Sequence, residues 1–268
     1  MSGLADLRRY PSDLNDEQWK LIRTFIPKSK YGGRPRSTNE RRTVDAIFYH
    51  VRTGCQWRQL PNDFPPWQTV YRYFSAWQRK GVVRRIQRAL YKLTRLYETR
   101  EKSPSAVVVD SQSVKTGKAG GPRGYDGGKR VKGRKRHLVT DTLGLMVDVH
   151  VTKANVHDNQ GARKVLSKAA RWLARKPKAI FADKGYQGKP FATWAKINIG
   201  AVVHTSNNPA MTAKRFIPMK KRWVVERAFA WFGDYRRLDK DQERKISHST
   251  AMIRWAMISL MLKRIAAN

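Results

Sequence analysis

Residues 14–100 carry a helical pattern, in which apolar side chains recur every three to four positions. Three start signals divide this stretch, two capping boxes and a proline pair, at Asn15 with Gln18, Ser37 with Glu40, and Pro65 with Pro66. The pattern predicts four helices, the last over residues 82–98. Their apolar stripes are formed by Trp19, Ile22 and Ile26; Val44, Ile47, Phe48 and Val51; Val70, Phe74 and Trp77; and Val83, Ile86, Leu90, Leu93 and Tyr97.

From residue 106 onward the pattern changes to the short apolar runs and two-residue alternation of strands. Strands are predicted over residues 106–110, 135–141, 145–151, 178–183 and 200–205. The second and third are separated by a short turn and should form an antiparallel hairpin. Helices are predicted over residues 159–176, 190–197, 219–233 and 246–266. This order predicts an α/β fold with a mixed sheet, preceded by a small all-helical domain, with domains at 1–102 and 103–268.

Composition adds a strong charge signal to this picture. The 268 residues carry a formal net charge of +36, while 40% of them are hydrophobic, which favours a folded protein over a disordered basic tail. A folded chain with this charge is expected to bind a polyanion, and nucleic acid is the commonest one. The single cysteine, Cys55, fits a reducing cytosol. No signal peptide or membrane-spanning stretch is expected.

Two basic regions are candidates for contacting DNA. The third helix exposes Arg72, Arg79 and Lys80 in a helix-turn-helix-like setting, although a solvated face on a helical bundle explains them as well. Residues 115–136 hold seven glycines and nine basic residues against one acid, and are read as a surface loop that binds phosphates. The loop has no Walker motif, so no nucleotide cofactor is expected. Its candidate contacts are Lys129, Arg130, Lys132, Arg134 and Lys135.

Three acidic residues stand out from the other acids, most of which sit at helix starts or in loops. Asp110 ends the run "AVVVD", Asp183 ends the run "AIFAD", and Glu226 lies inside the apolar segment "RWVVERAFAWF". If the two strands are neighbours, their carboxylates lie side by side, and the helix can supply the third. Mg²⁺ or Mn²⁺, bound as two ions, would relieve the repulsion and catalyse phosphodiester chemistry. Taken singly, each Asp also fits a cap or turn, and Glu226 fits an ion pair with Arg222.

The histidines provide no competing site, since no pair has zinc-like spacing on a helix. His137 and His157 could lie near the carboxylates, but structural roles are favoured. Tyr186 follows Asp183 by three residues, and could stack on an unpaired base or close the turn. The sequence favours the turn.

Several ordered motifs resemble a known family. "VVVDSQSVKT", "GYDGGKRVKGRKRH", "ANVHD", "FADKGYQG" and "WVVERAFAWFGDYRRLDKDQER", together with the N-terminal "GCQWRQLPNDFPPWQTVYRYFSAW", are similar to the bacterial insertion-sequence transposases of group five, which have an Asp-Asp-Glu active site. The resemblance implies a ribonuclease H-like catalytic fold, with Asp110, Asp183 and Glu226 as metal ligands. It also implies a bacterial cytoplasmic protein, associated with the nucleoid, that uses two Mg²⁺ or Mn²⁺ ions.

The surroundings of Glu226 depart from the pattern of the broader superfamily. That pattern places Tyr, Arg and Lys at fixed positions around the Glu; Arg222 fits, while Met219 and Gly233 occupy the Tyr and Lys positions. Arg236 and Arg237 lie close by and are the candidates for the missing phosphate contact.

The function expected from this sequence is a DNA transposase. It would bind the inverted terminal repeats of its element as double-stranded DNA, cleave the ends, and transfer the 3′ ends to target DNA, as a homodimer or higher assembly on DNA. Two alternatives stay open. One is a catalytically silent DNA-binding protein, such as a repressor, and the other is a metal-dependent nuclease without strand transfer.

Overall fold

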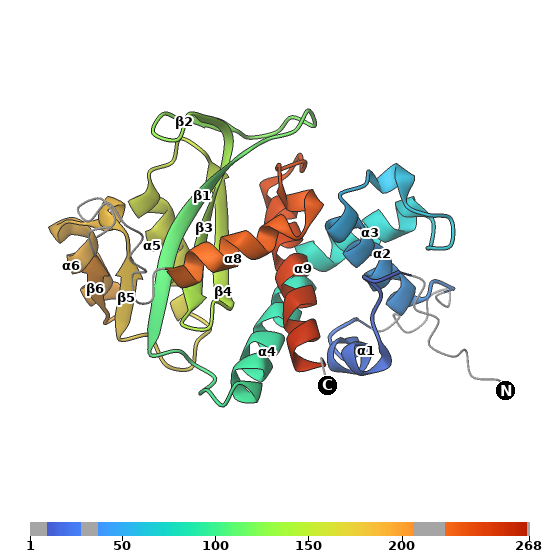
Figure 1. Ribbon diagram of the computed structural model, residues 1–268, viewed down its shortest axis with the longest axis horizontal. Coiled ribbons are helices and arrows are strands. Elements are labelled where there is room, and N and C mark those ends of the chain that lie inside the picture. The colour runs from blue at the N-terminus through green and yellow to red at the C-terminus, as the bar shows by residue number, and fades with distance from the viewer. Residues whose placement is uncertain (1–9, 28–36, 206–222, 267–268) are drawn as a thin grey trace, which may run out of the picture.

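The computed structural model describes residues 10–27, 37–205 and 223–266. The molecule is elongated, with the N-terminal helices at one end and the strands β5 and β6 with helix α6 at the other (Figure 1). The predicted α/β class, a mixed sheet flanked by helices and preceded by a helical region, is confirmed. In the described part of the chain, no helix is long and apolar enough to cross a membrane.

The N-terminal helices follow the predicted order, with bounds α1 Asp16–Arg23, α2 Glu40–Thr53, α3 Trp67–Arg79 and α4 Val82–Tyr97, and a short 3₁₀ turn η1 at Trp57–Gln59. The capping box of Asn15 and Gln18 forms in both directions. The predicted start of α2 at Ser37 is wrong, because the side chain of Asn39 accepts from the amide of Arg42 and caps the helix. Asn is as good a cap as Ser, and here it stands directly before the helix.

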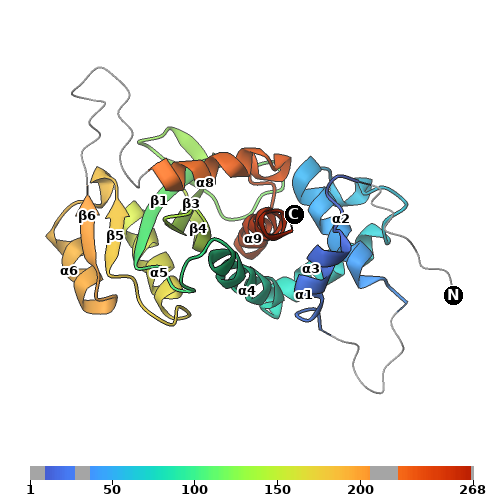
Figure 2. The ribbon, with the colours of Figure 1, turned by 60° about the horizontal axis from the view of Figure 1, so that its bottom comes forward.

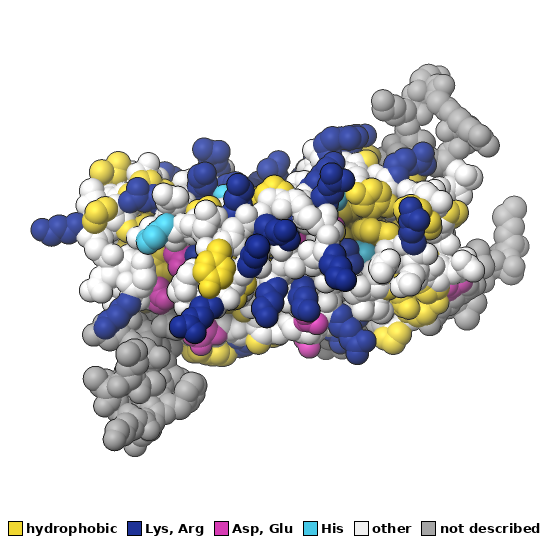
Figure 3. Space-filling view, turned by 90° about the horizontal axis from the view of Figure 1, so that it is seen from above, with side chains coloured by type: hydrophobic (Ala, Val, Ile, Leu, Met, Phe, Trp, Pro, Cys, Tyr) yellow, Lys and Arg dark blue, Asp and Glu magenta, His cyan; other side chains and the backbone are white. Residues whose placement is uncertain are grey.

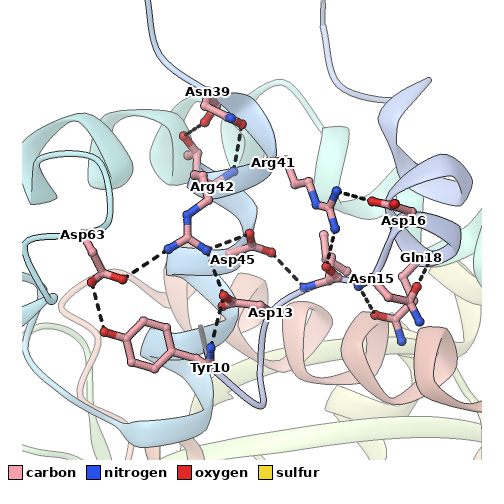
Figure 4. Close-up of polar contacts among 12 residues, drawn as sticks. Tyr10, Asp13, Asn15, Asp16, Gln18, Asn39, Arg41, Arg42, Asp45 and Asp63 are labelled. Carbon is pink, nitrogen blue, oxygen red and sulfur yellow. Dashed lines mark hydrogen bonds and ion pairs between the residues drawn. The ribbon is translucent and has the colours of Figure 1, made fainter. Parts of the chain in front are cut away.

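A cluster of acids around Arg42 ties the segment before α1 to α2 (Figure 4). The Arg42 guanidinium lies 2.8 Å from Asp13, 3.3 Å from Asp45 and 3.5 Å from Asp63. Asp45 also accepts from the amide of Leu14 at 3.0 Å. Burial raises the pKa of Asp45 to about 6, because it outweighs the amide hydrogen bond and the attraction of Arg42.

This raised pKa predicts a pH dependence of stability. The folded protein binds the Asp45 proton more tightly than the unfolded chain, so the contribution is complete below pH ~4 and is lost as pH rises through ~6. Asp45→Asn should remove up to about 3 kcal/mol of this fall in the free energy of unfolding. Urea unfolding at pH 4, 5, 6 and 7 measures it, with exposed Asp16→Asn as the control. Equal pH slopes for Asp45→Asn and wild type would contradict the assignment.

The sheet has the strand order β2-β3-β1-β5-β6, and β4 pairs with β3 on the edge opposite β1, further along the strand than β2. Strands β3 and β4 form the predicted antiparallel hairpin, β1 pairs antiparallel with β3, and β1, β5 and β6 run parallel. The bounds are β1 Ala106–Lys115, β2 Gly124–Asp126, β3 Val131–Asp141, β4 Met146–Lys153, β5 Ala179–Ala182 and β6 Val202–Thr205.

The prediction of a basic loop over residues 115–136 is wrong for much of its length. Strand β3 begins at Val131, and β2 pairs with it. Gly133 shows why the glycine content misled: a Cβ there would lie 1.9 Å from the carbonyl oxygen of Val114 on β1. This glycine is required by the close approach of two strands and not by a phosphate.

Helices cover both faces of the sheet (Figures 1 and 2). Helix α5 lies on one face, since a Cβ at Gly161 of this helix would come within 2.1 Å of the His137 ring on β3. Helix α8 lies on the other face. The guanidinium of Arg136, which precedes His137 on β3, is 5.9 Å from the centre of the Phe232 ring on α8. The bounds of the helices and 3₁₀ turns beyond β4 are α5 Asp158–Ala170, η2 Lys184–Tyr186, α6 Lys189–Asn198, α8 Trp223–Gly233, η3 Arg236–Leu238 and α9 Ile246–Ile265.

Helix α9 connects the N-terminal helical region to the sheet. It packs on α2, α3 and α4 and also on strand β4 of the sheet. Its side chains are buried on nearly all sides, as predicted for a core helix, and include the fully buried Trp255. The helical region and the sheet therefore share one hydrophobic core, and the predicted domain boundary between residues 102 and 103 stays a prediction.

Candidate active site

Two of the predicted carboxylates belong to neighbouring parallel strands. Asp110 lies inside β1, which continues to Lys115 and does not end at Asp110 as predicted, and Asp183 directly follows β5. In the β1–β5 pair, Val107 lies opposite Ile180 and Val108 opposite Phe181. Continuing this register by two residues sets Asp110 opposite Asp183, and adjacent strands are separated by only about 4.8 Å. The condition on which the sequence argument depended, that the two strands are neighbours, is met.

The direction of Asp110 follows from the alternation of side chains along β1. Its neighbour Ser111 pairs with His137, which faces helix α5. Asp110 therefore projects on the opposite face, the one that α8 covers. The amide of Ser111 donates to Asp110 Oδ1 at 2.7 Å.

Asp183 ends β5 and begins the turn η2. Its Oδ1 is buried and has no hydrogen-bond partner within the described residues. A Cβ at Gly185 would lie 3.1 Å from this oxygen, so glycine leaves space beside the carboxylate that a larger residue would fill. A buried, unpaired carboxylate oxygen is costly unless something binds it, and a hard cation is the partner that carboxylates prefer. The donor set thus fits a divalent metal.

Glu226 lies in the first turn of α8, which packs against β1 and β3. The N-terminal end of α8 lies next to β1 in both ribbon views (Figures 1 and 2). The Glu226 side chain is exposed. Over the described ranges, no three His, Cys, Asp or Glu side chains are grouped closely enough to hold a metal ion. The structure thus sets two carboxylates on neighbouring strands and the third on the helix that covers them. The three carboxylates do not form a three-ligand cluster.

A second polar cluster lies on the α5 face of β1, and sequence reasoning missed it. Ser111 Oγ donates to Asp158 at 2.8 Å, and Lys135 Nζ lies 3.0 Å from Asp158 and 3.2 Å from Asp126. Lys129 Nζ donates to the carbonyl of Ser111 at 3.0 Å. The only signal in the sequence was the motif "ANVHD", which ends on Asp158; an acid at a helix start is otherwise explained by the helix dipole.

These contacts fix the charge states of the two acids. Although burial raises the pKa of Asp158, hydrogen bonds from Lys135 and Ser111 lower it below its ordinary value. Burial likewise raises the pKa of Asp126, and hydrogen bonds from Ser113, the Lys129 amide and Lys135 bring it down to about 2. Both acids are ionised at neutral pH, so Lys135 is already neutralised within the protein.

Tyr186 and the two histidines have structural roles. Tyr186 is buried against Phe191 and beside Ser111, so it closes the turn and is not exposed for stacking on a base. Burial, and then the nearby Asp110 and Asp158 carboxylates, raise the pKa of Tyr186 well above its usual value. Burial lowers the pKa of His137 to about 3, and its Nε2 lies 3.0 Å from Thr152 Oγ1. His157 caps α5 by accepting from the Asn159 amide.

The predicted DNA-contacting residues divide into two groups. Exposed side chains belong to Arg72, Arg79, Lys80, Lys129, Arg130, Lys132 and Arg236. Three others are engaged inside the protein, so the expected phosphate contact does not fit them. Arg134 is fully buried and lies 3.0 Å from Asp241. Arg237 donates two hydrogen bonds to Glu243, at 2.8 and 2.9 Å. Lys135 forms ion pairs with both Asp126 and Asp158. Arg222, with the Met219 beside it, lies outside the described residues.

Basic side chains spread over the face of the molecule seen from above (Figure 3). Lys and Arg side chains are distributed across this whole face, and few Asp or Glu side chains lie between them. A face with such an excess of positive charge attracts and orients a polyanion.

Comparisons with known proteins match two parts of the chain to described families. Residues 101–262 match a family model described as "Transposase DDE domain", and residues 14–87 match one described as "Putative transposase of IS4/5 family". An uncharacterised protein of Sinorhizobium fredii, y4sN, is 32% identical over 117 residues, which are 43% of this chain and 87% of the relative. An uncharacterised 16.2 kDa protein of insertion element IS402 from Burkholderia cepacia is 31% identical over 114 residues, 40% of this chain and 76% of the relative.

The resemblance found in the sequence motifs is thereby confirmed at the level of the combined IS4/5 family, and group five within it stays a prediction. The larger match covers more than half of the chain, including the positions of Asp110, Asp183 and Glu226. The chain belongs to the family of transposases with a DDE domain.

Proposed function

We propose that this protein is a DNA transposase that binds the inverted terminal repeats of its own element, cleaves phosphodiester bonds at the element ends, and transfers the 3′ ends to target DNA. The observation that carries the proposal is the register of β1 and β5, in which Val108 lies opposite Phe181, two residues before Asp110 and Asp183 respectively. The family match and the net charge of +36 support DNA as the substrate.

Asp110, Asp183 and Glu226 are the residues that would hold the metal, as two Mg²⁺ or Mn²⁺ ions. When bound, such ions activate the attacking oxygen and stabilise the leaving oxygen of a phosphodiester displacement. The buried, unpartnered oxygen of Asp183 supports this assignment. No nucleotide cofactor is required, because the energy of the broken phosphodiester bond is conserved in the bond that forms.

The remaining residues bind and orient the DNA. The exposed basic residues Lys129, Arg130 and Lys132, around the start of β3, would contact backbone phosphates, and so would the exposed Arg236 in η3. Arg72 and Lys80, on α3 and directly after it, are the candidates for reading the terminal repeats, while Arg79 lines a separate basic cavity. Two element ends must be joined in one reaction, so at least two protomers are required on DNA.

The test uses the DNA that flanks the gene. A labelled donor carrying those flanks is incubated with the purified protein, a target plasmid and Mg²⁺, and the products are separated on a denaturing gel. The proposal expects cleavage at the ends of an inverted repeat and a donor strand joined to the plasmid. Nicking without a joined product would identify a nuclease, and binding without cleavage would identify a silent DNA-binding protein; either outcome overturns the proposal.

A further inference from the structure

A cavity of about 600 Å³ lies where the junction of α3 and α4 meets β4, α5 and α9. Its lining is strongly basic and contains a single acid, Asp148. The six lysines and arginines come from four different helices and from the residue that follows one of them: Arg79, Arg84, Arg88, Lys168, Arg171 and Arg254. Cations from separate elements converge on one space, as in a built anion site.

The single acid cannot balance these charges. Asp148 is buried and is held by Arg254 at 2.6 Å and by Arg88 at 3.4 Å. In the described part of the chain, no ion pair is formed by the four other cations, which are Arg79, Arg84, Lys168 and Arg171. Those four are exposed at the rim, so an incoming anion can reach them.

Lys168 and His150 show the effect of this crowding. Lys168 Nζ lies 3.0 Å from His150 Nδ1, and an ammonium can only donate, so His150 must be neutral and accept. Burial and the neighbouring lysines lower the pKa of His150 to about 4, and burial and two arginines lower the pKa of Lys168. A negative charge in the cavity would raise the pKa of both groups.

The cavity and the carboxylates lie on opposite faces of the sheet. Asp148 and His150 occupy alternate positions on β4, and His150 pairs with His137, which faces α5. Asp110 projects on the α8 face. A stretch of duplex that reaches Asp110 and Asp183 therefore approaches the sheet from the other side.

The shape of the lining limits the ligand further. Apart from His150, no aromatic ring lines the cavity, and the remaining lining residues are small, aliphatic or polar. A nucleobase would have no stacking partner there, so the site is suited to a phosphate group alone. Several guanidinium groups supply the paired donors that phosphate oxygens accept.

We propose that this cavity binds a backbone phosphate of a second DNA duplex, separate from the one at the carboxylates. The inference rests on the proposed function in so far as the protein handles DNA. It gives a transposase the means to hold two duplexes on opposite faces of one sheet.

The experiment is a two-duplex capture assay with three forms of the full chain. Wild type, the double variant Arg84→Gln/Lys168→Gln, and the control Lys164→Gln are bound to an immobilised duplex, and a labelled second duplex is added over a salt series. Lys164 is exposed on the same helix as Lys168 but does not line the cavity. The replaced side chains are exposed and form no ion pair in the described structure, so the variants should fold; circular dichroism checks this.

Wild type and Lys164→Gln should capture the second duplex, and the double variant should lose most of it. The salt slope for the second duplex should fall by ~1 to 2, because each neutralised phosphate contributes ~0.9. Equal capture by the double variant overturns the proposal, and so does an equal loss in Lys164→Gln.

A second arm separates DNA from a small phosphate compound. Sodium tripolyphosphate should raise the melting temperature of wild type and of Lys164→Gln more than that of the double variant. If this difference appears while capture of the second duplex is unchanged, the site takes a free phosphate and the DNA assignment is wrong. A chain that captures two duplexes and never cleaves them would keep this inference and contradict the proposed function.

Discussion

Asp183→Asn is expected to lower the rate of Mg²⁺-dependent DNA cleavage by about a thousandfold and to leave duplex binding intact. Charge stabilisation by a catalytic metal is worth several kcal/mol, and about 4 kcal/mol corresponds to a factor of a thousand in rate. Asp183 Oδ1 is buried without a hydrogen-bond partner among the described residues, so asparagine fits the space but cannot supply the second anionic oxygen. The measurement combines a supercoiled plasmid nicking assay with fluorescence anisotropy on a labelled duplex.

The matched control is Asp239→Asn, which removes the same charge from an exposed position after η3. Its cleavage rate should stay within about twofold of wild type, since substitutions of exposed side chains away from a site have small effects. Equal activity of wild type and Asp183→Asn would mean that this carboxylate has no part in the chemistry. Loss of both cleavage and duplex binding would point to misfolding, which a thermal melt would reveal.

The largest expected effect on stability is at Arg134. Replacing it with methionine should lower the free energy of unfolding by ~3–5 kcal/mol, because it leaves the buried Asp241 carboxylate without its cation. Arg134 lies 3.0 Å from Asp241 and also donates to the carbonyls of Pro122 and Arg244. Asp241 would keep only the hydroxyl of Ser249 and the amide of Glu243 as donors. Urea unfolding followed by tryptophan fluorescence measures the change.

Lys132→Met is the matched control for Arg134→Met. Lys132 lies two residues earlier on the same strand but is exposed, so its loss should change stability by less than about 0.5 kcal/mol. The two residues lie in one basic sequence motif, but their variants should change different properties. Loss of Lys132 should lower the affinity for DNA, and loss of Arg134 should lower the stability of the fold. If Arg134→Met unfolds at the same urea concentration as wild type, the buried ion pair does not stabilise the fold.

The sequence predicted the two matched carboxylates because their signal is local. Each apolar run stops on an aspartate, although β1 itself continues to Lys115, and burial makes such runs easy to recognise. What the two runs could not show was their order in the sheet. Parallel neighbours are separated in sequence by a crossover, here the hairpin and α5, so the pairing of β1 with β5 is a tertiary property.

The charged segment "KRVKGRKRH" could not be resolved from sequence for a different reason. Lysines and arginines look alike in a pattern, and the partner that buries Arg134 is Asp241, more than a hundred positions away. Strand β3 buries Arg134, Lys135 and Arg136 in succession, against the rule that such residues stay exposed. Acids that are distant in sequence, on the segment after α8 and on α5, pair with Arg134 and Lys135 and make these residues structural.

The position of Glu226 also depends on tertiary structure. The helix was predicted, but its packing on β1 and β3 brings together elements that are far apart in the sequence. The Glu226 side chain is exposed, and the described residues contain no three-ligand cluster. The pair on neighbouring strands, Asp110 and Asp183, is therefore the part of the site with the stronger structural support.

Substitution of Asp110 by cysteine tests the central claim most directly, that these carboxylates bind the metal that cleaves DNA. A thiolate binds Mg²⁺ poorly and binds softer ions such as Mn²⁺ better. Both proteins would carry Cys55→Ser, which removes the only native cysteine. We predict that Asp110→Cys is inactive with Mg²⁺ and recovers cleavage with Mn²⁺, while the parent cleaves with both. Cleavage by Asp110→Cys with Mg²⁺ at the parent's rate would contradict the claim.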